Sequence, residues 1–261
     1  MTNIAHHTLV YDGLFDGFLS CVFHVFDRKL GAVQITKNGV ASTSLFSTSY
    51  PVTTNEAHAR RVWIGLKKKL SAREAPRLYA AFLSEQPNVE DLLLDYIRIV
   101  FESDKSVAGN YADPTILKVA QFAKNVGREV HRMEAFVRFK LTKDGLYFAN
   151  IAPDFDVIPL ISKHFESRYA DQRWMIYDLT RKYGIYYDLQ KVETVELTLT
   201  ENAIASKNCD LIFDPSEFEF QQLWKDYFDH TNIKARKNTR LHVQHVPKRY
   251  WKYLSEKGGE Y

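Results

Sequence analysis

Cysteine and glycine are both scarce in this sequence of 261 residues, which has two cysteines and eleven glycines. Cys21 and Cys209 are far apart and no CxxC pair occurs, so this chain alone cannot form a four-cysteine zinc site or an iron–sulfur cluster. The glycine-rich signatures GxxxxGKS/T and GxGxxG are absent, as are HExxH and GxSxG. Nucleotide triphosphate hydrolysis, dinucleotide chemistry, zincin proteolysis and α/β-hydrolase chemistry therefore have no support. We expect neither a metal nor a cofactor.

Long hydrophobic runs are also missing. No stretch of 18 apolar residues occurs, and Asp12 and Asp16 lie where the apolar region of a secretory signal would be. The composition, with 45% hydrophobic and 26% charged residues, is that of a soluble globular protein. We expect a cytoplasmic protein with no membrane partner.

The pattern of apolar residues predicts an α+β fold with a helix-rich N-terminal half. We treat residues 1–261 as a single domain, with a possible sub-division into a helix-rich half, 1–110, and an α+β half, 111–261, that carries a basic C-terminal segment. The elements expected in the first half are strands at 8–11, 33–35 and 44–52, and helices at 14–26, 56–70, 72–84 and 89–101.

The second half opens with Asp113 and Pro114, a helix cap followed by proline at the first helical position. A hairpin follows, with strands at 135–141 and 146–151 joined by Asp144 and Gly145 in a type I′ turn. That two-residue turn places Leu141 opposite Phe148. The other face of the hairpin then collects Phe136, Arg138, Lys140 and Tyr147. This mixture of aromatic and basic groups suits contact with nucleic acid, and equally a solvent-exposed or helix-covered sheet face. Helix 155–168 and strands at 174–178, 184–187 and 193–197 complete an antiparallel or mixed sheet with flanking helices.

Polar residues that could carry acid–base chemistry are concentrated between residues 131 and 181. The candidates for catalysis are His131, Glu134, His164 and Asp178, because a histidine beside a carboxylate can move a proton at neutral pH. Alternatively, Glu134 and Asp178 form structural ion pairs with Arg138, Arg168 or Arg181. The sequence does not show whether these side chains converge.

Acidic residues are absent from residues 231–252, although this segment holds seven lysines and arginines. Cations without interspersed acids indicate contact with phosphates, and a large ring can stack on an unpaired base. The candidate nucleic-acid contacts are Arg138, Lys234, Arg236, Lys237, Asn238, Arg240, Lys248, Arg249, Tyr250 and Trp251, with Tyr250 or Trp251 in the stacking role.

Several long strings resemble a bacterial family assigned to DNA metabolism and DNA repair, which is also described as a domain of unknown function. They are YDGLFDGFLSCVF from Tyr11, HRMEAFVRFKLTKDGLYFANIAPDFDVIPLISKHFESRY from His131, RWMIYDLTRKYGIYYD from Arg173 and QQLWKDYFDHTNIKARKNTRLHVQHVPKRYWKYLSE from Gln221. The resemblance implies DNA as a partner, association with uracil-DNA glycosylase-like domains, and a separate radical SAM repair protein. It supplies no catalytic mechanism.

Three hypotheses follow. The first is a DNA repair or DNA metabolism protein that binds nucleic acid and acts with a separate repair enzyme. The second is an enzyme that acts on DNA or on a flipped base by His/carboxylate chemistry. The third is a docking scaffold for the radical SAM partner.

Overall fold

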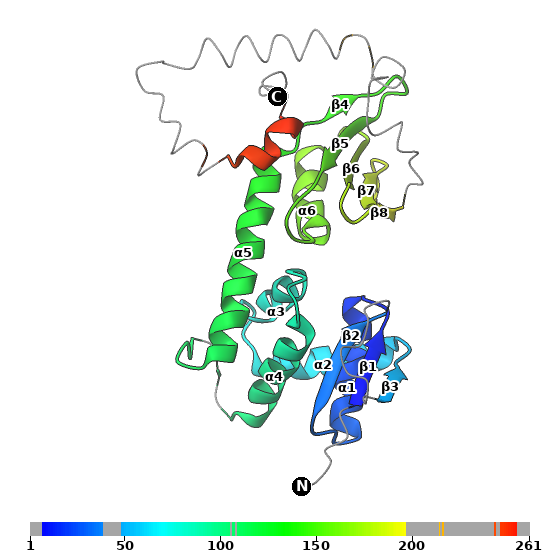
Figure 1. Cartoon of the computed structure of the whole chain (residues 1–261). Helices are drawn as coiled ribbons and strands as arrows, with labels where there is room; N and C mark the ends of the chain where they lie inside the picture. The colour runs from blue at the N-terminus through cyan, green and yellow to red at the C-terminus, as the bar shows by residue number, and fades with distance from the viewer. Residues whose placement is uncertain are drawn as a thin grey trace. The chain divides into compact units, whose positions relative to one another are not determined.

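The computed structural model describes residues 7–38, 48–104, 106–107, 109–196, 214, 216, 243 and 246–254 (Figure 1). The chain divides into two compact units, Met1–Gly127 and Arg128–Tyr261. This boundary lies within helix α5 (Pro114–Phe136), whereas the sequence analysis placed the possible sub-division between residues 110 and 111. The α+β class is confirmed, with helices predominating in the N-terminal half and a mixed sheet in the C-terminal half.

The first unit is built around a parallel sheet in the order β2-β1-β3. Its strands are β1 (His7–Tyr11), β2 (Val33–Lys37) and β3 (Thr48–Pro51). Helix α1 (Phe15–Asp27) connects β1 to β2 and packs on β1 and on α2 (Glu56–Lys69). Helices α3 (Ala75–Phe82) and α4 (Val89–Glu102) follow, and α4 packs against β2.

Apolar residues at helical spacing explain the core of this unit. In α4, Leu93, Leu94, Ile97 and Val100 recur on one face and are buried. In α2, only Ala59, Val62 and Leu66 are buried. Helix α2 therefore buries a narrow stripe and leaves most of its surface exposed.

The second unit holds a five-stranded mixed sheet in the order β4-β5-β6-β7-β8. Its strands are β4 (Lys140–Leu141), β5 (Tyr147–Ile151), β6 (Trp174–Asp178), β7 (Tyr183–Tyr187) and β8 (Val192–Val195). Strands β5 and β6 are parallel and are joined through helix α6 (Ile158–Arg168), while the other pairs are antiparallel. A short 3₁₀ helix, η2 (Lys248–Tyr253), lies near the end of the chain.

The predicted hairpin is wrong in its turn and register. Lys140 pairs with Phe148 and Leu141 with Tyr147, one residue away from the expected pairing. A type I′ turn needs positive φ at both central residues, but here Gly145 has φ 75° and Asp144 is not among the residues with positive φ. Instead, the Gly145 amide donates to the Thr142 carbonyl and the Thr142 amide to the Leu146 carbonyl, which makes a three-residue loop.

The first hairpin strand is also shorter than predicted. Helix α5 continues to Phe136, and β4 comprises two residues. The expected sheet face of Phe136, Arg138, Lys140 and Tyr147 is therefore not formed as one surface, because Phe136 belongs to the helix. Among the described residues, no helix is long and apolar enough to cross a membrane.

Candidate functional site

Helices α5 and α6 bring three of the four catalytic candidates together. The Nδ1 atoms of His131 and His164 each lie 3.8 Å from an oxygen of the Glu134 carboxylate, His131 at Oε2 and His164 at Oε1. The side chains of His131, His164 and Glu134 are 87%, 37% and 27% exposed, so solutes can reach both rings. A carboxylate that faces Nδ1 leaves Nε2 as the nitrogen for proton exchange with a bound molecule. The described residues contain no group of three or more His, Cys, Asp or Glu suited to a metal.

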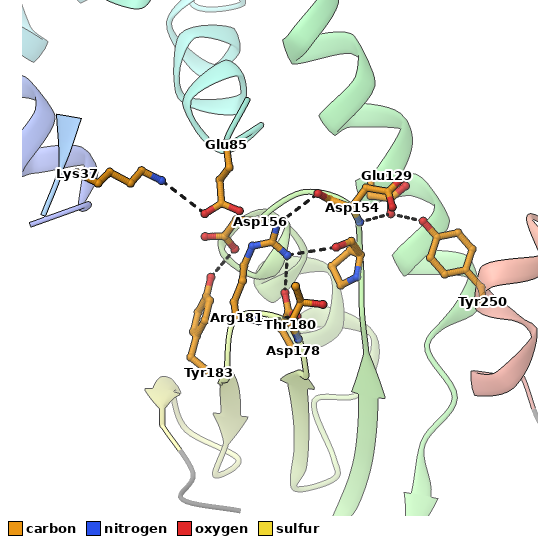
Figure 2. A network of polar contacts seen from close by, with 11 residues as sticks. Lys37, Glu85, Glu129, Asp154, Asp156, Asp178, Thr180, Arg181, Tyr183 and Tyr250 are labelled. Atoms are coloured by element: carbon orange, nitrogen blue, oxygen red, sulfur yellow. Dashed lines mark hydrogen bonds and ion pairs between the residues drawn. The ribbon is translucent and has the colours of Figure 1, made fainter. Parts of the chain in front are cut away.

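The fourth candidate, Asp178, lies in a separate network at the end of β6 (Figure 2). Its carboxylate is fully buried and accepts hydrogen bonds from the Arg181 guanidinium at 2.9 Å and the Thr180 amide at 2.8 Å. Arg181 also donates to the carbonyl of Pro153 at 3.2 Å. These contacts match the ion-pair alternative for Asp178, and they tie the loop after β5 to the turn between β6 and β7.

Arg138 was predicted to contact nucleic acid. Its guanidinium donates to the carbonyl oxygens of Ala135 at 2.8 Å and Val137 at 3.3 Å, within its own stretch of chain. Carbonyls at the end of a helix attract cations, so this arginine stabilises the C-terminal end of α5.

A buried carboxylate that the sequence analysis missed, Glu129 on α5, organises the same end of the second unit. One of its oxygens accepts hydrogen bonds from the Tyr250 hydroxyl and the Asp154 amide, the latter at 3.0 Å (Figure 2). The other oxygen faces the guanidinium groups of Arg132 at 3.2 Å and Arg249 at 3.4 Å. A signal existed in the sequence, because Glu129 falls on the apolar stripe of this helix, where an unpaired charge is rare.

Two aspartates in the loop after β5 were also missed. Asp154 forms a salt bridge with Arg249 at 2.6 Å, and Asp156 accepts a hydrogen bond from the Tyr183 hydroxyl at 2.5 Å. Burial, with the neighbouring Asp156 carboxylate, raises the pKa of Tyr183 above its ordinary value. The hydroxyl therefore remains a proton donor to Asp156 at neutral pH.

The stacking role predicted for Tyr250 and Trp251 does not fit helix η2. Tyr250 is 2% exposed and Trp251 is 8% exposed, so neither ring presents a face to solvent. Burial and the adjoining Glu129 carboxylate raise the pKa of Tyr250, which keeps its hydroxyl protonated as a donor. The Trp251 indole donates to the Val246 carbonyl at 3.0 Å. Both rings anchor η2.

The remaining predicted nucleic-acid contacts divide into two groups. Lys248 is exposed, with its ammonium group 5.8 Å from the Trp251 ring centre, and Arg249 is held by the acidic residues described above. The others lie outside the described residues: Lys234, Arg236, Lys237, Asn238 and Arg240.

A second basic surface, which the sequence analysis did not single out, lies on α2 and the start of α3. We call it the α2 basic face. It comprises seven exposed cations: Arg60, Arg61, Lys67, Lys68, Lys69, Arg73 and Arg77. The only acid among residues 60–77, Glu74, is buried and accepts a hydrogen bond from the Ser71 amide at 2.7 Å.

Charge is strongly concentrated on the α2 basic face. Seven cations less one acid give residues 60–77 a net charge of +6, and since the whole chain carries +3, all other residues together carry −3. Within the described part of the chain, none of the seven cations forms a salt bridge with a carboxylate. A hollow in the surface is lined by three of these cations together with one acid and three apolar residues: Glu56, Ala57, Arg60, Arg61, Ile64, Gly65 and Lys68. The arrangement suits an extended anion.

Comparison with known proteins shows the family of this chain. Residues 87–256 match the DUF4130 family, which is described as a domain of unknown function, and the chain belongs to that family. No curated protein matches. A pGpG-specific phosphodiesterase, PggH from Vibrio cholerae, is similar at 9% identity over 70% of this chain and 81% of its own, with a TM-score of 0.31. A likeness this low carries no argument about fold or function.

Proposed function

We propose that this protein binds nucleic acid and serves DNA metabolism or repair in the cytoplasm, alongside a separate repair enzyme. The observation that carries the proposal is the α2 basic face, where seven exposed cations carry no salt bridge to the described carboxylates. Lysines and arginines that face solvent without acids release counterions from a phosphate backbone, which drives binding. The uracil-DNA glycosylase-like domains and the radical SAM protein implied by the resemblance are the expected functional companions.

The charge pattern of the α2 basic face is not that of an ordinary solvent-exposed helix. Exposed helices normally alternate cations and acids, because oppositely charged neighbours three or four residues apart stabilise the helix. In α2, by contrast, the only acid is Glu56 in the first turn, four residues before Arg60, so Arg61 and Lys67–Lys69 have no acid at that spacing. An anionic partner would supply the missing opposite charge.

The test is binding of the purified full chain to a fluorescent DNA duplex, measured by anisotropy between 0.05 and 0.3 M salt, about the range over which phosphate contacts weaken. A variant in which Arg60, Arg61, Lys67 and Lys68 are all changed to Gln should bind more than about 100-fold more weakly at 0.15 M salt. The control, Lys29→Gln with Lys191→Gln, removes two exposed cations elsewhere and should keep most of the affinity.

A separate variant, Arg236→Ala with Arg240→Ala, measures the contribution of the C-terminal basic segment. Wild-type protein that binds no nucleic acid at low salt would overturn the proposal.

The convergence of His131, Glu134 and His164 favours a second candidate function, acid–base catalysis on DNA or on a flipped base. Two imidazoles beside one carboxylate can divide the roles of proton acceptor and proton donor. Product should form when the protein alone is incubated with uracil-containing or undamaged duplex, and it should be lost in His131→Gln and in His164→Gln. Lys163→Gln, a neighbouring exposed change, is the control. Absence of product with the wild-type protein would remove this candidate.

A further inference from the structure

The α2 basic face has a regular spacing that points to the form of nucleic acid it contacts. Arg60 and Arg61 form one pair of adjacent cations, and Lys67 and Lys68 form a second pair seven residues further on. Seven residues are close to two helical turns, so the pairs point in nearly the same direction and lie about 10.5 Å apart along the helix axis. Ile64 lies midway between them.

We propose that α2 lies across the minor groove of double-stranded DNA, with one cation pair at the phosphates of each strand. This inference rests on the proposed nucleic-acid function and names its substrate class. The minor groove of B-form DNA is about 6 Å wide, so cations about 10.5 Å apart, on flexible side chains, reach the phosphates on both of its walls.

The middle of the face carries no charge. Gly65 lies there, and the Phe101 ring, 3.4 Å from where a β-carbon would be, accounts for the glycine through packing within the protein. Ile64 is the apolar residue between the cation pairs and is 40% exposed. The hollow lined by Glu56, Ala57, Arg60, Arg61, Ile64, Gly65 and Lys68 therefore has an uncharged centre between the two cation pairs, at the place where the open groove between the two strands would lie.

Single-stranded nucleic acid fits this face less well. Proteins that bind single strands combine cations with aromatic rings on which bases stack. The one aromatic side chain that α2 contributes besides His58 is Trp63, whose ring packs edge-on against Phe15, with their centres 5.5 Å apart. The His58 ring is stacked on Phe23, with their centres 3.9 Å apart. Neither ring lines the hollow.

The A-form helix of double-stranded RNA is also a poorer match. Its minor groove is wide and shallow, so the two rows of phosphates lie too far apart for the two cation pairs of one helix to reach both. The proposal therefore ranks B-form DNA above both a single strand and an RNA duplex of the same sequence.

The experiment compares three fluorescent ligands of one sequence, a DNA duplex, its single strand and an RNA duplex, by anisotropy of the full chain across a salt series. Four phosphate contacts predict that the logarithm of the binding constant falls with the logarithm of salt at a slope of about −3.6. Arg60→Gln with Arg61→Gln, and separately Lys67→Gln with Lys68→Gln, should each reduce that slope to about −1.8. Each should weaken duplex binding about 30-fold at 0.15 M salt. Single-stranded DNA and duplex RNA should bind at least about tenfold more weakly than duplex DNA.

The outcomes separate this inference from the function on which it rests. Equal or tighter binding of the single strand or of the RNA duplex would overturn the minor-groove inference while leaving nucleic-acid binding in place. A slope that changes for one pair but not for the other would also overturn it, because both strands would then not be contacted. No binding to any of the three ligands would overturn both.

Discussion

The buried Glu129 carboxylate offers the sharpest test of how the second unit is held together. Changing Tyr250 to Phe removes one hydroxyl from this carboxylate, while the Asp154 amide still donates to the same oxygen at 3.0 Å. A hydrogen bond to an ionised group contributes about 1.5–3 kcal/mol. We therefore expect Tyr250→Phe to lower the free energy of unfolding of the second unit by about 1.5–3 kcal/mol.

Removing the carboxylate itself should cost more. In Glu129→Leu, the Tyr250 hydroxyl and the Asp154 amide lose their acceptor, and each buried unpaired donor costs about 1–3 kcal/mol. The side chains of Arg132 and Arg249 are 29% and 42% exposed, so water can replace much of their interaction. We expect a loss of about 3–5 kcal/mol, a large fraction of the stability of an ordinary domain.

A double-mutant cycle isolates the hydroxyl–carboxylate interaction. Once Glu129 is Leu, the Tyr250 hydroxyl is a buried donor without its acceptor, so the further change to Phe should recover about 1–3 kcal/mol. The two effects should therefore couple by at least about 2.5 kcal/mol. Urea titrations followed by circular dichroism and by tryptophan fluorescence give these free energies, fitted with a separate transition for each unit. A change in stability of less than about 0.5 kcal/mol in Tyr250→Phe, with the two changes additive, would refute a stabilising hydrogen bond between Tyr250 and Glu129.

Three further predictions concern single residues. Gly184→Ala should lower the melting temperature strongly, because a β-carbon would lie 2.3 Å from the Ile176 carbonyl oxygen, whereas Gly127→Ala, in an open helical position, should raise it slightly by improving helix propensity. Burial raises the pKa of the Cys21 thiol to about 12, so mass spectrometry should find it unalkylated by iodoacetamide at pH 8 until the protein is denatured. Burial lowers the pKa of His24 below its ordinary value, so near pH 6 the unfolded chain binds more protons than the folded chain. The free energy of unfolding should therefore fall as the pH drops from 7 to 5, and this fall should be smaller in His24→Gln.

Local sequence patterns were enough to predict most elements of the fold. The helical spacing of Leu93, Leu94, Ile97 and Val100 marks α4, and Asp113 accepts hydrogen bonds from the Thr115 and Ile116 amides, as expected of a helix cap. The predicted turn and register of the hairpin were wrong because the Thr142 side chain forms hydrogen bonds across the loop. Its hydroxyl bonds both the Leu146 amide and the Leu146 carbonyl, an arrangement that dipeptide preferences do not report.

The candidate sites were predictable only in part, since they depend on contacts between distant residues. His131 and Glu134 lie on one helix face, but the approach of His164 requires the packing of α6 beside α5. The bond from Tyr250 to Glu129 joins residues 121 positions apart, and no local pattern indicates it. The α2 basic face, by contrast, was visible as a run of cations and was overlooked in favour of the C-terminal segment.

That separation of 121 residues has a consequence for synthesis of the protein on the ribosome. Glu129 is translated long before Tyr250, and at about 5–20 residues per second the delay is about 6–24 s. Throughout this interval, the carboxylate on α5 lacks the hydroxyl that it later bonds, so burying it would be costly. We therefore expect the nascent second unit to remain incompletely folded until helix η2 emerges, which makes it a substrate for chaperones during translation.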